Sequence, residues 1–268
     1  MSTFSLEEYL NRVGHAGAVE ATLDTLTSLH RAHLYAIPFE NLDIQMGGGV
    51  ALDAETLQAK LVRRRRGGYC FEHNTLFSLA LQSIGFVVQT REARVRQNAA
   101  GAVRPRTHMV LQVRVEGRDW LADVGFGGDG LLEPIALDGG SAVQAGVPYR
   151  VTPEHSLRVL QRYFAGAWED LYAVLPDPVY PIDLEAGNWF TSTHPHSPFV
   201  LNLTAQRMIG GTRHILRNLT YSTARGTEVH TREIARAELN PLLREIFGID
   251  VGDDVRFRAL DGAAQTVK

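Results

Sequence analysis

The one cysteine of the chain, Cys70, is the residue best suited to nucleophilic chemistry. It follows Gly67 and Gly68, and the residues after it are apolar at helical spacing up to Gly85. Because glycine permits a tight turn, the sequence predicts that the sulfur lies in the first turn of a helix. The unsatisfied N–H groups and partial positive charge there favour a thiolate. A lone cysteine is often only a small buried hydrophobe, but this context favours a nucleophile.

A nucleophilic cysteine needs a base, and the base needs a group that orients it. His108 begins one predicted strand, and Asp123 lies in the next, where an unpaired carboxylate among apolar residues is costly. If Glu116–Gly117 is the hairpin turn, Asp123 faces Val110 and lies diagonally from His108 at roughly 7–8 Å. A turn shifted by one residue would break this contact. Each residue alone could be structural, but with Cys70 they predict a Cys–His–Asp triad.

Helices are predicted to position the cysteine in the first third of the chain. Ser5 and Glu8 have the spacing of a capping box, and the stretch 21–36 carries leucines at helical intervals. His30 and His33 lie in that stretch. Their neighbours supply no further metal ligands, so we expect them to pack or cap rather than bind a metal.

Alternating polar and apolar residues predict short strands in the middle third, as in a β-barrel or sandwich. The predicted strands are 86–95, 108–115, 120–124, 149–151, 157–164 and 168–174. A turn-rich segment over 176–181 follows. From residue 198 onward, apolar stretches mix with a predicted helix over 241–247, which indicates a smaller α/β section.

Bulk composition excludes several classes of function. A chain of 268 residues can form one to three domains, and a net charge of −3 gives no reason to expect a nucleic-acid partner. No apolar run approaches the roughly 20 residues that span a bilayer, and the acidic start of the chain is unlike a signal peptide. One cysteine allows no internal disulfide, which fits a reducing compartment. We therefore expect a cytoplasmic protein that binds neither nucleic acid nor a membrane.

Motifs distributed over nearly the whole chain together resemble those of the arylamine N-acetyltransferases. They are IPFENLDI at 37–44, RGGYCFEHN at 66–74, THMVL at 107–111, DVGFG at 123–127, STHPHSPF at 192–199 and FGI at 247–249. The combination of PFEN with RGGxCxExN is highly specific, whereas the histidine or aspartate motif alone would be weak.

This resemblance implies an α+β fold with three regions and a triad similar to that of cysteine proteases. The regions are a helical bundle over 1–85 that carries the cysteine, an antiparallel β-barrel over 86–197 that carries the histidine and aspartate, and an α/β lid over 198–268. The resemblance also implies ping-pong transfer of an acetyl group from acetyl-CoA, through a thioester on Cys70, to the nitrogen of an arylamine, arylhydrazine or hydrazide. Acetyl-CoA is then a cosubstrate, and neither a tightly bound cofactor nor a metal is expected.

Residues within the matching motifs are candidates for binding the substrates. Phe39, Phe71 and Phe126 can line an apolar pocket that shields a thioester from water, although core packing would explain each one alone. Gly127 and Gly128 offer backbone N–H donors for the pyrophosphate of CoA.

The basic run Arg63–Arg66 is expected to be mainly a solvated face with local ion pairs. Its last member, Arg66, adjoins the glycine turn and is predicted to pair with Glu40. The other arginines are weaker candidates for CoA phosphates.

Two other activities remain open from the sequence. A hydrolase of protease or transglutaminase type uses the same triad in the same order, and amide synthases that release a polyketide chain as a macrolactam share the family's motifs. A zinc site on Cys70 and His73 lacks the four ligands of a structural site.

Overall fold

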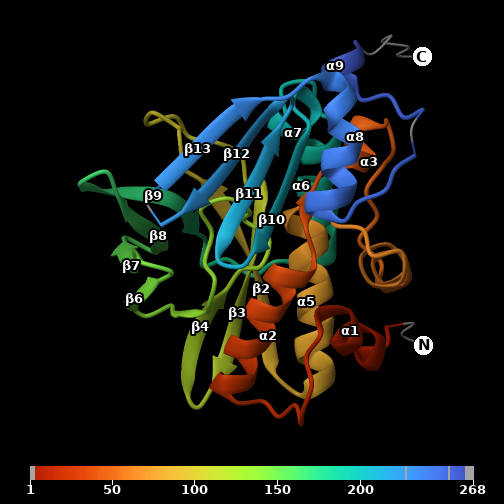
Figure 1. Cartoon of the computed structure of the whole chain (residues 1–268). Helices are drawn as coiled ribbons and strands as arrows, with labels where there is room; N and C mark the ends of the chain where they lie inside the picture. The colour runs from red at the N-terminus through yellow and green to blue at the C-terminus, as the bar shows by residue number, and fades with distance from the viewer. Residues whose placement is uncertain (1–3, 227, 253, 263–268) are drawn as a thin grey trace.

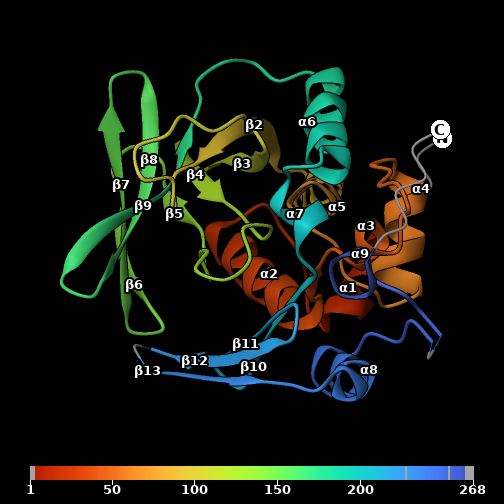
Figure 2. The same ribbon diagram turned by 90° about the horizontal axis from the view of Figure 1, so that it is seen from above.

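Three regions of secondary structure pack together in the computed structural model, which describes residues 4–226, 228–252 and 254–262 (Figure 1). Helices come first, a barrel-like antiparallel sheet second, and a smaller sheet with short helices last. Seen from above, the smaller sheet lies along one side of both the helices and the barrel (Figure 2). This is the predicted α+β architecture. Among the residues described, no helix has both the length and the apolar character needed to cross a membrane.

The first region consists mainly of helices. They are α1 Leu6–Val13, α2 Leu23–Ala36, α3 Leu42–Gln45, α4 Ala54–Leu57, the π-helix η1 Gln58–Arg63 and α5 Cys70–Ile84. The predicted cap of α1 is present, because the Ser5 hydroxyl accepts the N–H of Glu8 at 3.3 Å. Helix α5 begins at Cys70, and Gly85 ends it in the left-handed conformation with φ 106°, as the sequence predicts.

The second region is an eight-stranded antiparallel sheet in the order β5-β4-β3-β2-β9-β8-β7-β6. The strands are β2 Val87–Val95, β3 His108–Val115, β4 Arg118–Ala122, β5 Ile135–Ala136, β6 Ser141–Gln144, β7 Val147–Glu154, β8 Leu157–Phe164 and β9 Ala167–Val174. Strand β4, predicted over 120–124, begins and ends two residues earlier, at Arg118–Ala122. The β3–β4 pairing ends at Leu111 opposite Ala122, so Asp123 and Val124 lie just beyond the strand.

The hairpin between β3 and β4 has the predicted register. Val115 pairs with Arg118, so Glu116 and Gly117 are the two turn residues. Both have positive φ angles, 52° and 78°, which match the right-handed twist of the strands they join. The hairpin therefore brings the end of β4 close to His108 at the start of β3.

The third region is built on a five-stranded sheet in the order β1-β10-β11-β12-β13. Helix α6 Pro181–Thr193 precedes this region. The elements of the region are α7 Pro198–Leu201, β10 Thr204–Ile209, β11 Thr212–Arg217, β12 Thr220–Arg225, β13 Glu228–Glu233, the 3₁₀ turn η2 Arg236–Glu238, α8 Leu239–Leu242, the π-helix η3 Leu243–Phe247 and α9 Arg258–Asp261. The edge strand β1, Phe39–Glu40, comes from the first region and pairs with β10. This pairing joins the PFEN motif to the last part of the chain.

Helix α6 was not predicted from the sequence. Its buried side chains include Asn188, Thr191 and Ser192, whereas Ile182 and Trp189 are each 67% exposed. Because its fully buried residues are polar and two of its large apolar residues are exposed, hydrophobic periodicity gives little helical signal here.

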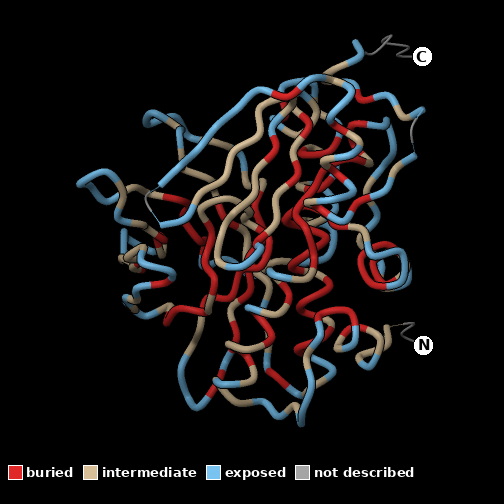
Figure 3. Tube along the Cα trace, viewed as in Figure 1, coloured by how far each residue is buried: buried red, intermediate tan, exposed pale blue. Residues whose placement is uncertain are grey.

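Helix α5 packs against β3, which fixes the cysteine relative to the barrel. Leu76, Phe77 and Ala80 of the helix are fully buried in one cluster with Leu111 and Val113 of the strand. Buried segments accordingly run through the middle of the molecule (Figure 3). The core therefore holds the N-terminus of α5 beside the first residue of β3.

Candidate functional site

Close packing around a glycine turn places Cys70 at the start of α5. A Cβ atom on Gly67 would lie 1.9 Å from the carbonyl oxygen of Pro38, and one on Gly68 would lie 2.6 Å from Oε2 of Glu72. Only glycine fits at either position. The same carboxylate accepts the N–H of Tyr69 at 3.1 Å, which caps the helix one residue before the cysteine.

A cluster of oppositely charged side chains stabilises this turn. Lys60 Nζ lies 2.7 Å from Glu72 and 2.6 Å from Asp43, and its side chain is almost fully buried. Arg66 contacts Glu40 at 2.8 Å and Asp43 at 2.9 Å, which confirms the predicted Arg66–Glu40 ion pair. Each buried charge therefore has a partner, as burial requires.

His108 and Asp123 are in direct contact. His108 Nε2 donates to Asp123 Oδ2 at 2.8 Å, and both side chains are buried. Burial alone would lower the pKa of His108, but the charge of Asp123 and hydrogen bonds with Asp123 and Cys70 raise that pKa to about 10. Burial likewise opposes the charge on Asp123, yet the imidazolium and its hydrogen bond lower the pKa of the carboxyl. The pair therefore favours an imidazolium beside a carboxylate at neutral pH.

The thiol of Cys70 lies at the same place. Its Sγ donates to the carbonyl oxygen of Thr107 at 3.6 Å, immediately before His108 in the chain. Since Nε2 of His108 is bonded to Asp123, Nδ1 is the ring nitrogen available to the sulfur. The structure thus brings together the three residues that the sequence predicted as a triad.

Asn74, to which the sequence analysis gave no role, connects α5 to the end of β4. Its Nδ2 donates to Asp123 Oδ1 at 2.9 Å, and its Oδ1 accepts the N–H of Val124 at 3.0 Å. It lies four residues after Cys70 and therefore on the same helix face, which is the signal that could have identified it. Gly125 also donates its N–H to Asp123 Oδ1, at 2.9 Å.

Tyr172 of β9 was also missed by the sequence analysis. Its ring centre lies 4.9 Å from that of His108 and 5.1 Å from that of Phe126. Burial and the nearby charge of Asp123 both raise the pKa of its phenol, so the hydroxyl stays protonated. Nothing local in the sequence of β9 marks this residue, because its role depends on the pairing of β2 with β9.

A cavity of about 770 Å³ opens onto Cys70 and His108. The phenylalanine side chains that line it are Phe39, Phe126, Phe190 and Phe199. Two of the three predicted pocket phenylalanines, Phe39 and Phe126, are therefore on its wall. The third, Phe71, is not among the lining residues and packs instead against the ring of Tyr69, 5.6 Å between centres.

Besides His108, the charged residues on the cavity wall are two arginines and one aspartate. Asp129 is paired with Arg162, so its charge is neutralised. Arg104 precedes β3, and Arg217 is the last residue of β11. Together they give the wall a net positive charge. Such a wall suits a ligand that carries phosphate or carboxylate groups.

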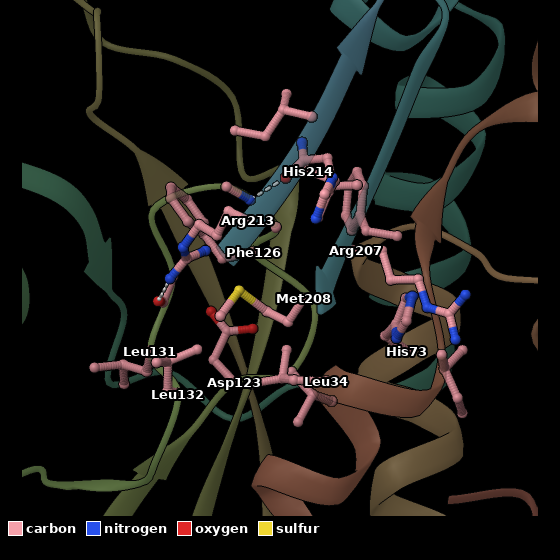
Figure 4. A pocket seen from close by; sticks show the side chains of 18 residues that line it. Leu34, His73, Asp123, Phe126, Leu131, Leu132, Arg207, Met208, Arg213 and His214 are labelled. Atoms are coloured by element: carbon pink, nitrogen blue, oxygen red, sulfur yellow. Dashed lines mark hydrogen bonds between the residues drawn. The ribbon is translucent and has the colours of Figure 1, made fainter. Parts of the chain in front are cut away.

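The predicted phosphate-binding turn lies beside this cavity. The N–H of Gly128 donates to Gln206 Oε1, and the carbonyl of Gly127 accepts the N–H of Gly130 at 2.8 Å. Both glycines also line a smaller cavity of about 40 Å³ (Figure 4). The labelled side chains there include Asp123 and Leu132, so the loop between them forms part of both walls.

The two histidines of α2, His30 and His33, form hydrogen bonds with other residues and not with each other. His33 contacts Tyr9 at 2.9 Å and His73 at 2.8 Å, while His30 contacts the backbone of Asp123 and Leu132. Within the part of the chain that the structure describes, no three His, Cys, Asp or Glu residues are grouped so as to hold a metal ion.

Comparison with known proteins gives one consistent family. The family model described as N-acetyltransferase matches residues 22–256. The arylamine N-acetyltransferase of Mycolicibacterium smegmatis is 43% identical over 252 residues, which are 91% of this chain and 92% of the relative. A solved structure of the M. smegmatis enzyme superposes with a TM-score of 0.91 at 38% identity, covering 97% of this chain and 100% of the other. The Mycobacterium marinum arylamine N-acetyltransferase, solved in complex with CoA, gives a TM-score of 0.87 at 38% identity and covers 93% of this chain and 95% of the other.

Proposed function

Because the chain belongs to the arylamine N-acetyltransferase family, we propose that Cys70, His108 and Asp123 carry out its acetyl transfer. The activity is that of the family, with acetyl-CoA as cosubstrate and an arylamine as acceptor. The observation that supports this assignment of residues is the 2.8 Å contact of buried His108 and Asp123 on a cavity that also exposes Cys70. The arrangement matches a nucleophile, a base and an orienting acid.

The first half-reaction loads the acetyl group onto the enzyme. The thiolate of Cys70 attacks the acetyl carbonyl carbon of acetyl-CoA, and the carbonyl oxygen becomes an oxyanion. N–H groups in the first turn of α5 have no partner within the helix and are candidates to stabilise that charge. The bond to the CoA sulfur then breaks, and the imidazolium of His108 supplies the proton that CoA carries away. A thioester on Cys70 and a neutral His108 remain.

The second half-reaction delivers the acetyl group to the amine. The amine nitrogen attacks the thioester carbonyl, and neutral His108 accepts the proton that the nitrogen loses. The C–S bond breaks, the acetylated amine leaves, and the thiolate–imidazolium pair is restored. Asp123 stays ionised throughout and holds the Nε2–H tautomer. Phe39 and Phe126 on the cavity wall limit access of water to the thioester.

The cavity has the properties needed to bind acetyl-CoA as well as an aromatic amine. Its volume of about 770 Å³ is in the range of small-molecule sites, its aromatic walls suit an aryl ring, and Arg104 and Arg217 suit phosphates. Gly127 and Gly128 remain our proposed pyrophosphate turn, with the N–H of Gly128 available once Gln206 turns away.

We propose that the three regions divide this work. Residues 1–85 supply the nucleophile, residues 86–197 supply the base and acid, and residues 198–268 close the cavity through the face of β10 and β11 that carries Gln206 and Arg217. A lone reactive thiol stays reduced in a compartment such as the cytoplasm, which we propose as the site of action.

Steady-state kinetics test this mechanism. With acetyl-CoA and an arylamine both varied, a thioester intermediate predicts parallel double-reciprocal lines, and Cys70→Ser is expected to reduce turnover below detection while it keeps the wild-type melting temperature. Intersecting lines together with an active Cys70→Ser would contradict the assignment. An amide synthase would show no turnover with this pair of substrates.

A further inference from the structure

We propose that His30 is a positioning residue for acetyl transfer, because its imidazole joins the two ends of the loop 123–132 and so sets Asp123 against His108. This inference rests on the proposed triad. We call residues 123–132 the site loop. It begins with Asp123, ends with Leu132, and carries Phe126 on the wall of the large cavity.

The contacts of His30 determine which of its nitrogens carries the proton. Nδ1 lies 3.0 Å from the carbonyl oxygen of Leu132, which only accepts, so Nδ1 must donate. Nε2 lies 3.1 Å from the backbone nitrogen of Asp123, which only donates, so Nε2 must be bare and accept. The neutral Nδ1–H tautomer alone satisfies both. Burial lowers the pKa of His30 to about 4, so the neutral form persists at neutral pH.

Asp123 needs this partner because its backbone N–H lies beyond the last paired residues of the sheet. The β3–β4 pairing ends at Leu111 opposite Ala122, one residue earlier. A buried backbone N–H without an acceptor is unfavourable, so the loop would otherwise rearrange to find one. His30 provides the acceptor from α2, 93 residues away in the chain.

The imidazole is itself held rigidly. His30 is fully buried, and its ring makes an edge contact with Phe77 of α5, with centres 5.9 Å apart and an interplanar angle of 81°. Because the imidazole ring is rigid, the distance between its two nitrogens is constant. The ring therefore fixes the separation of Asp123 N and Leu132 O. The helix that carries Cys70 therefore also helps to position the loop that carries Asp123.

The effect on catalysis is expected to be intermediate. Asn74 and Gly125 still hold the carboxylate of Asp123 when His30 is lost, so the acid remains near the base. A displacement of about 1 Å in a catalytic group can cost on the order of 10²-fold in rate, and a partial displacement costs less. We expect His30→Leu to lower kcat by about 10- to 100-fold, with KM for acetyl-CoA changed by less than about twofold.

Three substitutions at this position separate positioning from packing. His30→Leu removes both hydrogen bonds. His30→Gln can accept from Asp123 and donate to Leu132, so it should restore kcat to within about threefold of wild type. His30→Asn reaches Leu132 but not Asp123, so it should keep much of the stability while losing rate. This variant keeps the proposal testable if His30→Leu does not fold.

His33→Leu is the matched control, since His33 is equally buried on the same helix and also makes two hydrogen bonds. The second readout is the pH dependence of Cys70 alkylation by iodoacetamide, which reports the thiolate–imidazolium pair. His30→Leu should shift the midpoint of that profile to higher pH. His33→Leu should lower the melting temperature but leave the midpoint of the alkylation profile unchanged.

The proposal is overturned if folded His30→Leu or His30→Asn keeps the wild-type kcat and alkylation profile, or if His30→Gln is as slow as His30→Leu. Asp123→Asn is measured alongside. If Asp123→Asn itself keeps wild-type activity, the proposed triad has failed, independently of what His30 does.

Discussion

At the scale of single residues, the proton between His108 and Asp123 decides the chemistry. The charge of the carboxylate and the hydrogen bonds outweigh the burial that opposes an imidazolium, and the pKa of His108 rises to about 10. An imidazolium on His108 is the partner that the proposed thiolate of Cys70 requires. In the proposed mechanism the acid therefore acts through the base and need not touch a substrate.

Asp123→Asn tests this role. The amide keeps the shape of the side chain but removes the charge and favours the wrong tautomer of His108, so kcat/KM is expected to fall by on the order of 10³–10⁴. Steady-state rates with acetyl-CoA and an arylamine measure it, and a far-ultraviolet spectrum checks the fold. Retention of most of the activity would rule out the orienting role.

Some of the site could be predicted from the sequence because its signals are local. The glycines before Cys70, the hairpin turn at Glu116–Gly117 and the alternation in β3 each depend on neighbouring residues. Asn74, His30 and Tyr172 could not be assigned roles in this way, because their partners come from other elements and depend on the tertiary packing. The resemblance of the motifs indicated the family but did not reveal these contacts.

At the scale of elements, the contact between α5 and the site loop leaves no room for a side chain. A Cβ atom on Gly125 would lie 2.6 Å from Asn74 Nδ2 and 2.8 Å from the Cα and carbonyl oxygen of Cys70. Glycine at this position therefore lets the loop that carries Asp123 approach the helix that begins at Cys70. Most of these atoms belong to backbone and cannot move without shifting α5.

Gly125→Ala is accordingly expected to lower the free energy of unfolding by about 1–3 kcal/mol and also to lower kcat. Urea unfolding and steady-state rates measure the two effects. Gly49→Ala is the control, because a Cβ atom there meets nothing within 4 Å, and it should leave both quantities near wild type. Equal behaviour of the two variants would contradict the close approach.

The same scale explains what sequence patterning missed in the fold. Helix α6 buries Asn188, Thr191 and Ser192 and exposes Trp189, so its polarity runs opposite to that of an ordinary surface helix. Helices α1, α2 and α5 and the strands β2, β3, β4, β7, β8 and β9 follow the ordinary pattern and were predicted to within a few residues, whereas β5 and β6 were not predicted. Patterning succeeds where burial and polarity agree.

At the scale of the whole molecule, buried histidines set the range of pH over which the fold is stable. Burial lowers the pKa of His30 and of His73 to about 4, from 6.5, and also lowers the pKa of His33. As pH falls from 6.5 to about 4, the unfolded chain binds protons that the folded chain does not, so stability decreases. His108 has the opposite sign, and its contribution is lost as pH rises from 6.5 towards 10.

We therefore expect the free energy of unfolding to be greatest near neutral pH and to fall towards pH of about 4.5, because the three histidines outweigh Glu72, whose pKa burial raises to about 7 and whose contribution has the opposite sign. Urea titrations at about pH 7 and about pH 4.5 measure this difference. His33→Leu should flatten the acid side of the profile, since one neutral buried histidine is removed. A wild-type profile that is level over this range would show that these histidines are not held neutral.

Intact-protein mass spectrometry can detect whether Cys70 carries the acetyl group between the two substrates. Wild type and Cys70→Ala are each mixed with acetyl-CoA in the absence of an amine. We expect one added acetyl group on the wild type, none on the variant, and loss of the adduct when an arylamine is added. Equal acetylation of both proteins, or an adduct that survives the amine, would contradict this role of Cys70.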